Sequence, residues 1–337
     1  MKQNKINKGV VLIADRVNDF NDIDISSDYL EFIEDDYFNE IYDGLSSVSS
    51  SIIYYDSPAD FLKNVVKHKN DIVFSIWSGR KSRNRRALVP SICEAYNIFY
   101  VGADTYANIL CQDKILSKQF SLKNEMSTPN YLFYEGDKFD NILIENLKLP
   151  LVIKPNFEGG SIGISQDCLV DSYEKAISKI SELYLIYKQP ILIEEFIKGK
   201  EVSIVILGNQ EEIVLCEVLE LYIQDNKYDI ENGIFSYEVK KGSSDMKLSN
   251  KLITHDFPEK ILNNSISLFK NLGKVEVLRI DGRYDGENFY LIELSPDIHF
   301  GKGSTFSDAF MLKEIDYTEM LRMILLNTIE MDNKKSS

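Results

Sequence analysis

Two segments in the second half of the chain carry residue types suited to binding and moving a phosphoryl group. The first is Lys154, which ends an apolar run and precedes the glycine-rich stretch 156–163. Glycines let backbone N–H groups approach a phosphate closely, and a neighbouring lysine adds a positive charge. Such a stretch is also typical of an ordinary hairpin turn, and this alternative stays open here. The chain lacks G-x-x-x-x-G-K-[ST], and no G-x-G-x-x-G follows its first strand.

The second segment contains Arg279, Asp281, Glu293 and Ser295 on two apolar runs separated by Asp285-Gly286. Residues two apart on a strand face the same side, and Asp-Gly favours a tight hairpin turn. The pattern therefore predicts that Asp281 and Glu293 lie close together across a pair of strands. Two neighbouring carboxylates suit a Mg²⁺ ion that carries substrate phosphates, and an arginine beside them suits a developing negative charge. The alternative is a set of polar residues on a half-exposed sheet.

Composition excludes several classes of protein. The chain has 337 residues, of which 53 are acidic and 38 basic, giving a net charge of −15. Such a charge argues against a nucleic-acid binder that works by general electrostatic attraction. Eleven of the acidic residues fall between Asp15 and Asp43, with Arg16 as the only basic residue there, so most of the excess is local. The length predicts two to three packed units.

Cysteine and histidine usage argues against a zinc knuckle and against a Ser-His-Asp triad. The four cysteines and three histidines are scattered, without a Cys-x-x-Cys pair or a disulfide pattern. No uncharged apolar run reaches the 18 or more residues that a membrane helix needs, and the chain opens without a signal-peptide pattern. We therefore expect a cytoplasmic protein without membrane partners.

The elements that must position these residues fall into two patterns. In the first hundred residues, short apolar runs alternate with helical spacing, which favours an open parallel α/β sheet. The expected strands are Gly9–Ala14, Ser51–Tyr55, Asp71–Trp77 and Ile98–Gly102, and the expected helices are Ala59–Lys69, Val89–Tyr96 and Thr105–Asn124.

From about Pro150 onward, strands follow strands, which predicts an antiparallel α+β half. The expected strands are Leu151–Lys154, Ile191–Ile197, Glu201–Gly208, Glu212–Leu221, Val275–Arg283 and Glu287–Leu294. Asp171 and Glu174 form a capping-box signal before an apolar stripe from Tyr173 to Tyr187. A further helix is expected over Phe257–Leu272, and residues 332–337 are expected to be a frayed tail.

Taken in order, these residues resemble the ATP-grasp superfamily, and within it the D-alanine:D-alanine ligase-like branch. The resemblance runs from about Asp71 to Phe306. It implies an ATP-grasp fold, mixed α/β and α+β, with an N-terminal Rossmann-like domain of parallel strands. The expected domains are residues 1–105, a central lobe at 106–190 and a C-terminal lobe at 191–331. The matching blocks include Ser78-Gly79-Arg80, Val89-Pro90, Cys93-Glu94, Ile98 to Gly102 and Asp113-Lys114.

The resemblance also implies roles for individual residues. ATP would be bound by Lys114, Lys154, Gly159, Gly160, Ser161, Glu194, Phe196, Ile197, Glu201 and Lys240. Asp281, Glu293 and Ser295 would bind Mg²⁺. Catalytic roles would fall to Arg279, Lys240 and Ser161, and substrate contacts to Arg83, Arg86, Arg279, His299 and Ser304.

The implied activity is that of an ATP- and Mg²⁺-dependent carboxylate-amine ligase. It would form an amide bond between small molecules through an acyl phosphate and release ADP and phosphate. Two alternatives remain: loading an amino acid onto the thiol of an acyl carrier protein, and a nucleotide-binding homologue without catalysis. A homodimer is also expected, because dimers are common in this branch.

Several positions depart from the branch's pattern. Ser295 replaces an asparagine that joins a second Mg²⁺, and His299 stands where a glycine N–H is expected. Gly160 and Lys241 stand where the D-alanine enzymes carry a serine and a tyrosine of their first-substrate network. On these grounds we expect a substrate other than D-alanine.

A basic loop is the most unusual local feature. The segment from Arg80 to Arg86 holds five cations in seven residues within an acidic chain. By resemblance this loop lies beside a substrate pocket, which suggests a substrate with additional negative charge. The alternative is a solvated loop, because charge runs on surfaces are common.

Overall fold

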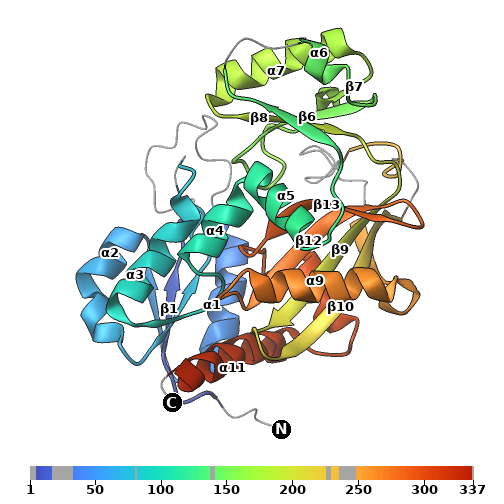
Figure 1. The fold of residues 1–337 in the computed structure, drawn as a ribbon. Helices are drawn as coiled ribbons and strands as arrows, with labels where there is room; N and C mark the ends of the chain where they lie inside the picture. The colour runs from blue at the N-terminus through green and yellow to red at the C-terminus, as the bar shows by residue number, and fades with distance from the viewer. Residues whose placement is uncertain are drawn as a thin grey trace.

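The computed structural model describes residues 5–16, 33–79, 82–136, 141–224, 229–234 and 248–335. Within these residues the strands form three sheets of four, five and four strands. Figure 1 shows the smallest lobe, with β6, β8 and α7, above two larger lobes that lie side by side. This mixed α/β and α+β architecture confirms the expected fold class.

The N-terminal sheet is parallel, with the strand order β2-β1-β3-β4. Its strands are β1 (Val10–Ile13), β2 (Ile52–Tyr55), β3 (Ile72–Ser75) and β4 (Phe99–Tyr100). All four residues of β1 are buried, as expected of a central strand covered on both faces. The connecting helices are α1 (Asp35–Val48), α2 (Pro58–Asn64) and α3 (Leu88–Tyr96). The helix expected over 59–69 is α-helical only to Asn64 and ends in a 3₁₀ turn.

The central sheet has the order β5-β8-β6-β7 and is antiparallel. Its strands are β5 (Tyr131–Tyr134), β6 (Leu151–Pro155), β7 (Leu169–Val170) and β8 (Ile191–Glu195), with α6 (Asn141–Ile144) and α7 (Tyr173–Tyr187). Because β8 pairs with β5 and β6, the domain boundary placed at 190/191 is wrong, and the central lobe extends to Glu195. The start of α7 also differs from the prediction, because Ser172, not Asp171, caps it by accepting the Lys175 N–H.

The C-terminal sheet is antiparallel, with the order β11-β10-β9-β12-β13. Its strands are β9 (Lys200–Gly208), β10 (Ile213–Ile223), β11 (Leu248–Leu252), β12 (Val277–Tyr284) and β13 (Phe289–Ser295). Helix α9 (Glu259–Asn271) packs on this sheet. The β12–β13 hairpin turns at Asp285-Gly286 as predicted, with Gly286 at a φ of 103° and Asp285 Oδ1 accepting two backbone N–H groups.

The single helix expected over Thr105–Asn124 is two helices, α4 (Thr105–Gln112) and α5 (Lys114–Lys123). The break is at Asp113, whose backbone is extended and whose side chain accepts the N–H groups of Ile115 and Leu116. An aspartate that caps a second helix in this way ends the first one. Buried residues of α4, including Ala107 and Leu110, pack into the core beneath the C-terminal sheet. Both helices therefore carry cavity residues on elements fixed to the C-terminal lobe.

The two ends of the chain pack together. Helix α11 (Tyr317–Lys335) follows α10 (Thr305–Met311) and lies against α1 of the N-terminal domain. Leu321, Ile324 and Leu325 are fully buried there, in one core with Ile41 and Leu45. Because α11 continues to Lys335, the expected frayed tail at 332–337 is wrong for its first four residues.

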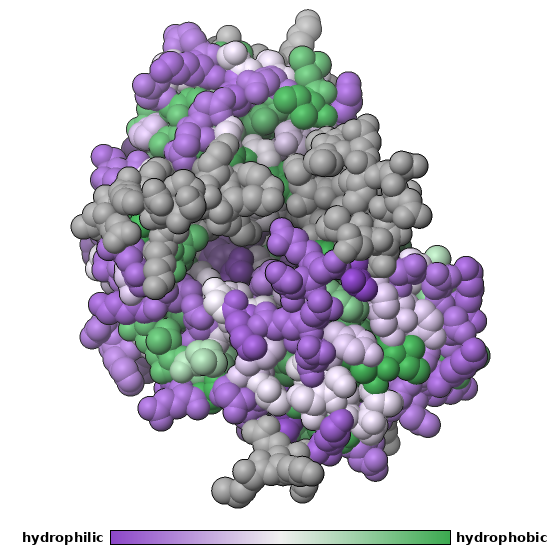
Figure 2. All heavy atoms as spheres, turned by 180° about the vertical axis from the view of Figure 1, so that it is seen from behind, coloured by the Kyte–Doolittle hydropathy of each residue, from purple (hydrophilic) through white to green (hydrophobic). Residues whose placement is uncertain are grey.

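The surface of the described residues is largely hydrophilic. Seen from the side opposite to Figure 1, hydrophobic residues form small groups separated by hydrophilic ones (Figure 2). None of the helices within the described residues is long and apolar enough to span a bilayer.

Candidate active site

A cavity of about 790 Å³ lies between the three sheets. This volume is within the range expected of a small-molecule site. Its wall contains most residues that the sequence singled out, namely Arg86, Lys114, Lys154, Gly159, Gly160, Ser161, Glu194, Phe196, Ile197, Glu201, Arg279, Asp281, Glu293, Ser295, His299 and Ser304. Lys240 and Lys241 fall outside the described residues. Arg83 is exposed and does not line this cavity.

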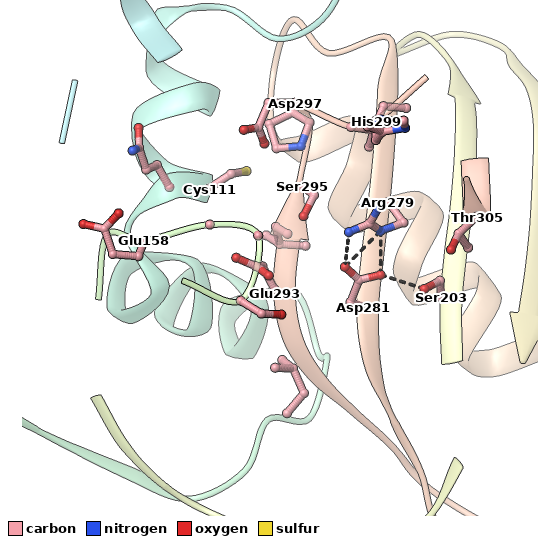
Figure 3. Close-up of a pocket in the computed structure, with 18 of the residues that line it drawn as sticks. Cys111, Glu158, Ser203, Arg279, Asp281, Glu293, Ser295, Asp297, His299 and Thr305 are labelled. Atoms are coloured by element: carbon pink, nitrogen blue, oxygen red, sulfur yellow. Dashed lines mark hydrogen bonds and ion pairs between the residues drawn. The ribbon is translucent and has the colours of Figure 1, made fainter. Parts of the chain in front are cut away.

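Arg279 and Asp281 form a two-pronged ion pair on the C-terminal sheet. Arg279 Nε and Nη2 donate to the two carboxylate oxygens of Asp281 at 2.8 and 2.7 Å. Ser203 Oγ, on the neighbouring strand β9, donates to Asp281 Oδ1 at 2.7 Å (Figure 3). Burial opposes the guanidinium charge, but the Asp281 carboxylate outweighs it and raises the pKa of Arg279. The arginine is thus held charged and in a fixed orientation at the cavity wall.

Glu293 and Ser295 extend this polar face on β13. The Cα atoms of Asp281 and Glu293 are direct partners in the β12–β13 ladder, and those of Arg279 and Ser295 are also partners. This register confirms the predicted pairing. Lys114 Nζ on α5 donates to Glu293 Oε1 at 3.0 Å. Burial favours the neutral acid, but the Lys114 ammonium outweighs it and lowers the pKa of Glu293, so this carboxylate is ionised.

This donor set fits a magnesium ion that is shared with a phosphate. Asp281 and Glu293 supply carboxylate oxygens and Ser295 a hydroxyl, the oxygen ligands that Mg²⁺ takes alongside substrate phosphates. No group of three or more His, Cys, Asp and Glu side chains suited to a metal occurs within the described ranges. A cation here would take its remaining ligands from water and from a bound phosphate.

Lys154 lies deep in the cavity wall and contacts Glu194. Glu194 is also 2.7 Å from Lys118 Nζ, an ion pair that lacks hydrogen-bond alignment. The Lys118 side chain is fully buried, and those of Lys154 and Glu194 are exposed by 4% and 3%. Burial opposes ionisation of Glu194, but the two ammonium groups lower its pKa to about 2. Sequence reasoning missed Lys118, although it follows Lys114 by four residues and therefore shares its helix face.

The glycine-rich stretch is anchored at its start. Asn156 Nδ2 donates to Asp113 Oδ1 at 2.8 Å, and Asn156 Oδ1 accepts the N–H of Ile115. Lys114 Nζ donates to the backbone carbonyl of Glu158 at 2.5 Å. Gly160 and Ser161 then adopt positive φ angles of 60° and 66°. The stretch is thus a turn of unusual backbone conformation that lines one side of the cavity.

The end of the cavity near β8 has the features of a nucleotide-base pocket. Phe196 and Ile197 line it just after β8, next to buried Glu194. Arg283 Nη1 lies 3.2 Å from Glu201 Oε1, and its guanidinium lies over the Phe196 ring at 4.8 Å. Burial raises the pKa of Glu201. Apolar side chains with a carboxylate close by suit a purine with a ribose.

The opposite end of the cavity is formed by the basic loop and the segment after β13. Arg86 Nε pairs with Asp297 Oδ2 at 2.9 Å, and Arg86 Nη1 donates to the Trp77 carbonyl. Arg85 Nη2 lies 3.8 Å from Glu158 Oε2. Both arginines that reach the cavity therefore face a carboxylate, which weakens the interpretation that the loop awaits an additional negative charge.

His299 and Ser304 lie near this end. The His299 ring stacks on Tyr37 with centroids 3.8 Å apart, and the Gly301 N–H points to its Nδ1. The Tyr37 hydroxyl accepts the Phe300 N–H. Ser304 caps α10 by accepting the Ser307 N–H, so this residue has a structural role in addition to any contact with a ligand.

Comparisons with known proteins agree with this arrangement. Residues 125–326 match the family model described as the D-ala D-ala ligase C-terminus. The D-alanine–D-alanine ligase of Carboxydothermus hydrogenoformans is 26% identical over 300 residues, covering 86% of this chain and 91% of that relative. The corresponding ligase of Pelagibacter ubique is 28% identical over 271 residues, covering 78% and 82%.

Solved structures share the fold. A D-alanine–D-alanine ligase from Bacillus anthracis complexed with ATP superposes with a TM-score of 0.74 at 18% identity, over 98% of this chain and all of that one. The VanG D-Ala:D-Ser ligase from Enterococcus faecalis has a TM-score of 0.68 at 19% identity, over 96% of this chain and all of the other.

Proposed function

The chain belongs to the ATP-grasp ligases that share the D-ala D-ala ligase C-terminal domain, and from this membership we infer that it joins an amino-acid carboxylate to an amine. It is an ATP-dependent ligase. In the proposed reaction a carboxylate oxygen attacks the γ-phosphorus of ATP and ADP leaves. The amine nitrogen then attacks the acyl carbon, loses a proton, and phosphate departs.

The main observation behind this proposal is the position of Arg279. Binding a nucleotide does not require an arginine fixed between the metal-binding carboxylates and the substrate end of the cavity. Asp281 and Ser203 hold Arg279 so that its remaining N–H groups can stabilise the negative charge of an acyl phosphate and of the tetrahedral intermediate. Such stabilisation needs no reorganisation during the reaction, because the donors are already oriented.

We assign the nucleotide to the end of the cavity near β8. Lys114, Lys154 and Lys240 would neutralise the phosphates, and the Gly159–Gly163 stretch, with Ser161, would cover them. Phe196, Ile197 and Glu194 would hold the base, and Glu201 the ribose hydroxyls. Mg²⁺ bound through Asp281, Glu293 and Ser295 would supply charge neutralisation for phosphoryl transfer. These assignments rest on the lining of the cavity and on the two-carboxylate face.

Two observations bear on the identity of the amino-acid substrate. The names of the relatives favour D-alanine. His299 and Asp297, however, place two polar side chains beside the substrate end of this cavity, and Ser295 and Gly160 depart from the expected pattern. We propose an amino acid other than D-alanine as the preferred substrate. The names of both relatives refer to amino-acid substrates, so we propose an amine rather than a carrier-protein thiol as the acceptor.

The decisive experiment is a measurement of ADP release with Mg-ATP and pairs of added amino acids, with D-alanine plus D-alanine as the reference pair. We expect release to depend on both substrates, at least one other pair to exceed the reference, and the product to be the sum of both amino acids less one water. Nucleotide binding without turnover for any pair would refute the ligase. A fastest rate with D-alanine would refute only the substrate assignment.

The basic loop gives a second prediction. Arg86→Gln should raise the KM for the carboxylate substrate by about tenfold or more, because it removes a charge-assisted hydrogen bond at the cavity wall. Arg83→Gln removes the same charge from an exposed position of the same loop and should leave this KM unchanged within about twofold. Equal effects of the two substitutions would mean that the loop acts through its overall charge.

A further inference from the structure

Asp297 is unusual among the carboxylates of the cavity wall. Six carboxylates of the cavity wall form ion pairs with a lysine or an arginine. Among these six, the Asp297 side chain is the most exposed to solvent, at 36%, compared with 30% for Glu293 and 23% for Asp281. Its contact with Arg86 uses one oxygen, Oδ2. Within the described residues, the other oxygen takes no hydrogen bond. Asp297 therefore presents an unfilled acceptor oxygen to the cavity.

The position of Asp297 relates it to the reacting groups. It follows Ser295 by two residues, beyond the end of β13, and its charge acts on Arg279. Figure 3 shows the Asp297 side chain beyond Ser295, on the same side as Glu293 and Cys111. A molecule whose carboxylate lies at Arg279 can thus bring a neighbouring positive group toward Asp297.

Arg86 holds the Asp297 side chain in place. The guanidinium of Arg86 joins the Asp297 carboxylate to the backbone carbonyl of Trp77, which follows β3 in the N-terminal domain. Asp15, a buried acid just after β1, is not available for this role, because its two oxygens accept the N–H groups of Ser78 and Gly79 at 2.8 and 2.7 Å. Asp15 is also buried and does not line this cavity.

We propose that Asp297 binds the ammonium group of an amino-acid substrate and that Arg86 is a positioning residue that holds it there. An ammonium group has three N–H donors and complements a carboxylate that has one oxygen available. Because Arg86 already faces a carboxylate, this end of the cavity suits a zwitterion better than a dianion. The inference rests on the proposed ligase function and specifies its substrate class as acids with a free amino group beside the reacting carboxylate.

The experiment measures binding rather than turnover, so that it is independent of the ligase reaction. Calorimetry in the presence of a non-hydrolysable ATP analogue and Mg²⁺ compares D- and L-alanine, which carry the head group of any amino acid, with D- and L-lactate, which carry a hydroxyl instead. For Asp297→Asn we expect alanine to bind at least about tenfold more weakly, while lactate changes by less than about twofold.

Glu40→Gln is the matched control. Glu40 pairs with Lys302 at 3.3 Å and accepts the Lys302 N–H, so it also links α1 to the segment after β13 without lining the cavity. It should leave the preference for alanine over lactate unchanged. Equal losses for alanine and lactate in Asp297→Asn, no loss, or no binding of either alanine to the wild type would overturn the inference. If ADP release fails but this selectivity is found, the proposed reaction is wrong and the ammonium site stands.

Discussion

Asp281→Ala is expected to lower the rate of ADP release by at least about a hundredfold, a loss of ~2.7 kcal/mol of transition-state stabilisation. The substitution removes a predicted magnesium ligand and also releases Arg279, whose Nε and Nη2 both bind this carboxylate. Two groups that act on the same developing charge are thus lost together. The measurement is steady-state ADP release at saturating Mg-ATP, with a Mg²⁺ titration that should show a higher half-saturating concentration.

A matched control separates this effect from the loss of any arginine–carboxylate pair. Glu319 binds Arg322 on α11 in the same two-pronged manner, with both distances at 2.7 Å, but away from the cavity. Glu319→Ala should leave turnover unchanged within about twofold, because neither member of this pair lines the cavity. Near-normal turnover in Asp281→Ala, with the fold intact by thermal unfolding, would refute the assigned site.

The Asp281–Glu293 pairing could be predicted because every step of it is local. A short turn signal joins two apolar runs, and a tight turn fixes the register of the strands that it connects. Once the register is set, alternation places both carboxylates on one face. The parallel N-terminal sheet could be predicted for a similar reason, since β1 and β3 are short runs of β-branched and aromatic residues between helical segments.

The contacts of the basic loop could not be predicted in this way. Arg86 and Asp297 are more than two hundred residues apart in the sequence, and only the packing of the N-terminal domain against the C-terminal lobe brings them together. The charge run from Arg80 to Arg86 indicated an unusual loop but not which of its cations reach the cavity. The cations of this loop differ in solvent exposure, since Arg83 is exposed and Arg85 is buried.

Two errors in the predicted fold have the same origin. The run from Thr105 to Asn124 has continuous helical spacing, but Asp113 interrupts it by capping α5. Asn156, from another lobe, holds this break by binding both the Asp113 side chain and the first turn of α5. The sequence pattern also predicts that β8 belongs to the C-terminal lobe, because other strands follow it in sequence. Its register with β5 and β6 places it in the central sheet. Sequence order carries no information about either contact.

The buried Lys118–Glu194–Lys154 cluster gives the second large expected effect. Glu194→Gln should lower the free energy of unfolding by about 3 kcal/mol or more, because removing one partner of a buried pair leaves the remaining charge uncompensated. Here two ammonium groups would remain, one of them on a fully buried side chain. Chemical denaturation at neutral pH measures the change, and the KM for ATP should rise in parallel, because Lys154 loses the group that positions it.

The charge balance of the cluster predicts an asymmetry between its members. Lys118→Met removes one of the two cations and leaves Glu194 and Lys154 as a neutral pair, so it should cost clearly less stability than Glu194→Gln. If burial alone mattered, Lys118→Met would cost more stability than Glu194→Gln, because the Lys118 side chain is larger and more completely buried than that of Glu194. A larger loss in Lys118→Met would therefore show that packing, rather than charge compensation, holds this part of the cavity together.

The pH dependence of the unfolding free energy also distinguishes charge compensation from packing. The pKa of Glu194 falls from 4.5 to about 2 on folding, so the folded state binds its proton less tightly than the unfolded state. Its stabilising contribution is complete above about pH 4.5 and is lost as the pH falls toward 2. The difference in unfolding free energy between wild type and Glu194→Gln should therefore shrink as the pH falls below about 4.5. A difference that stays constant down to pH 3 would assign the stabilisation to packing instead, because packing does not titrate.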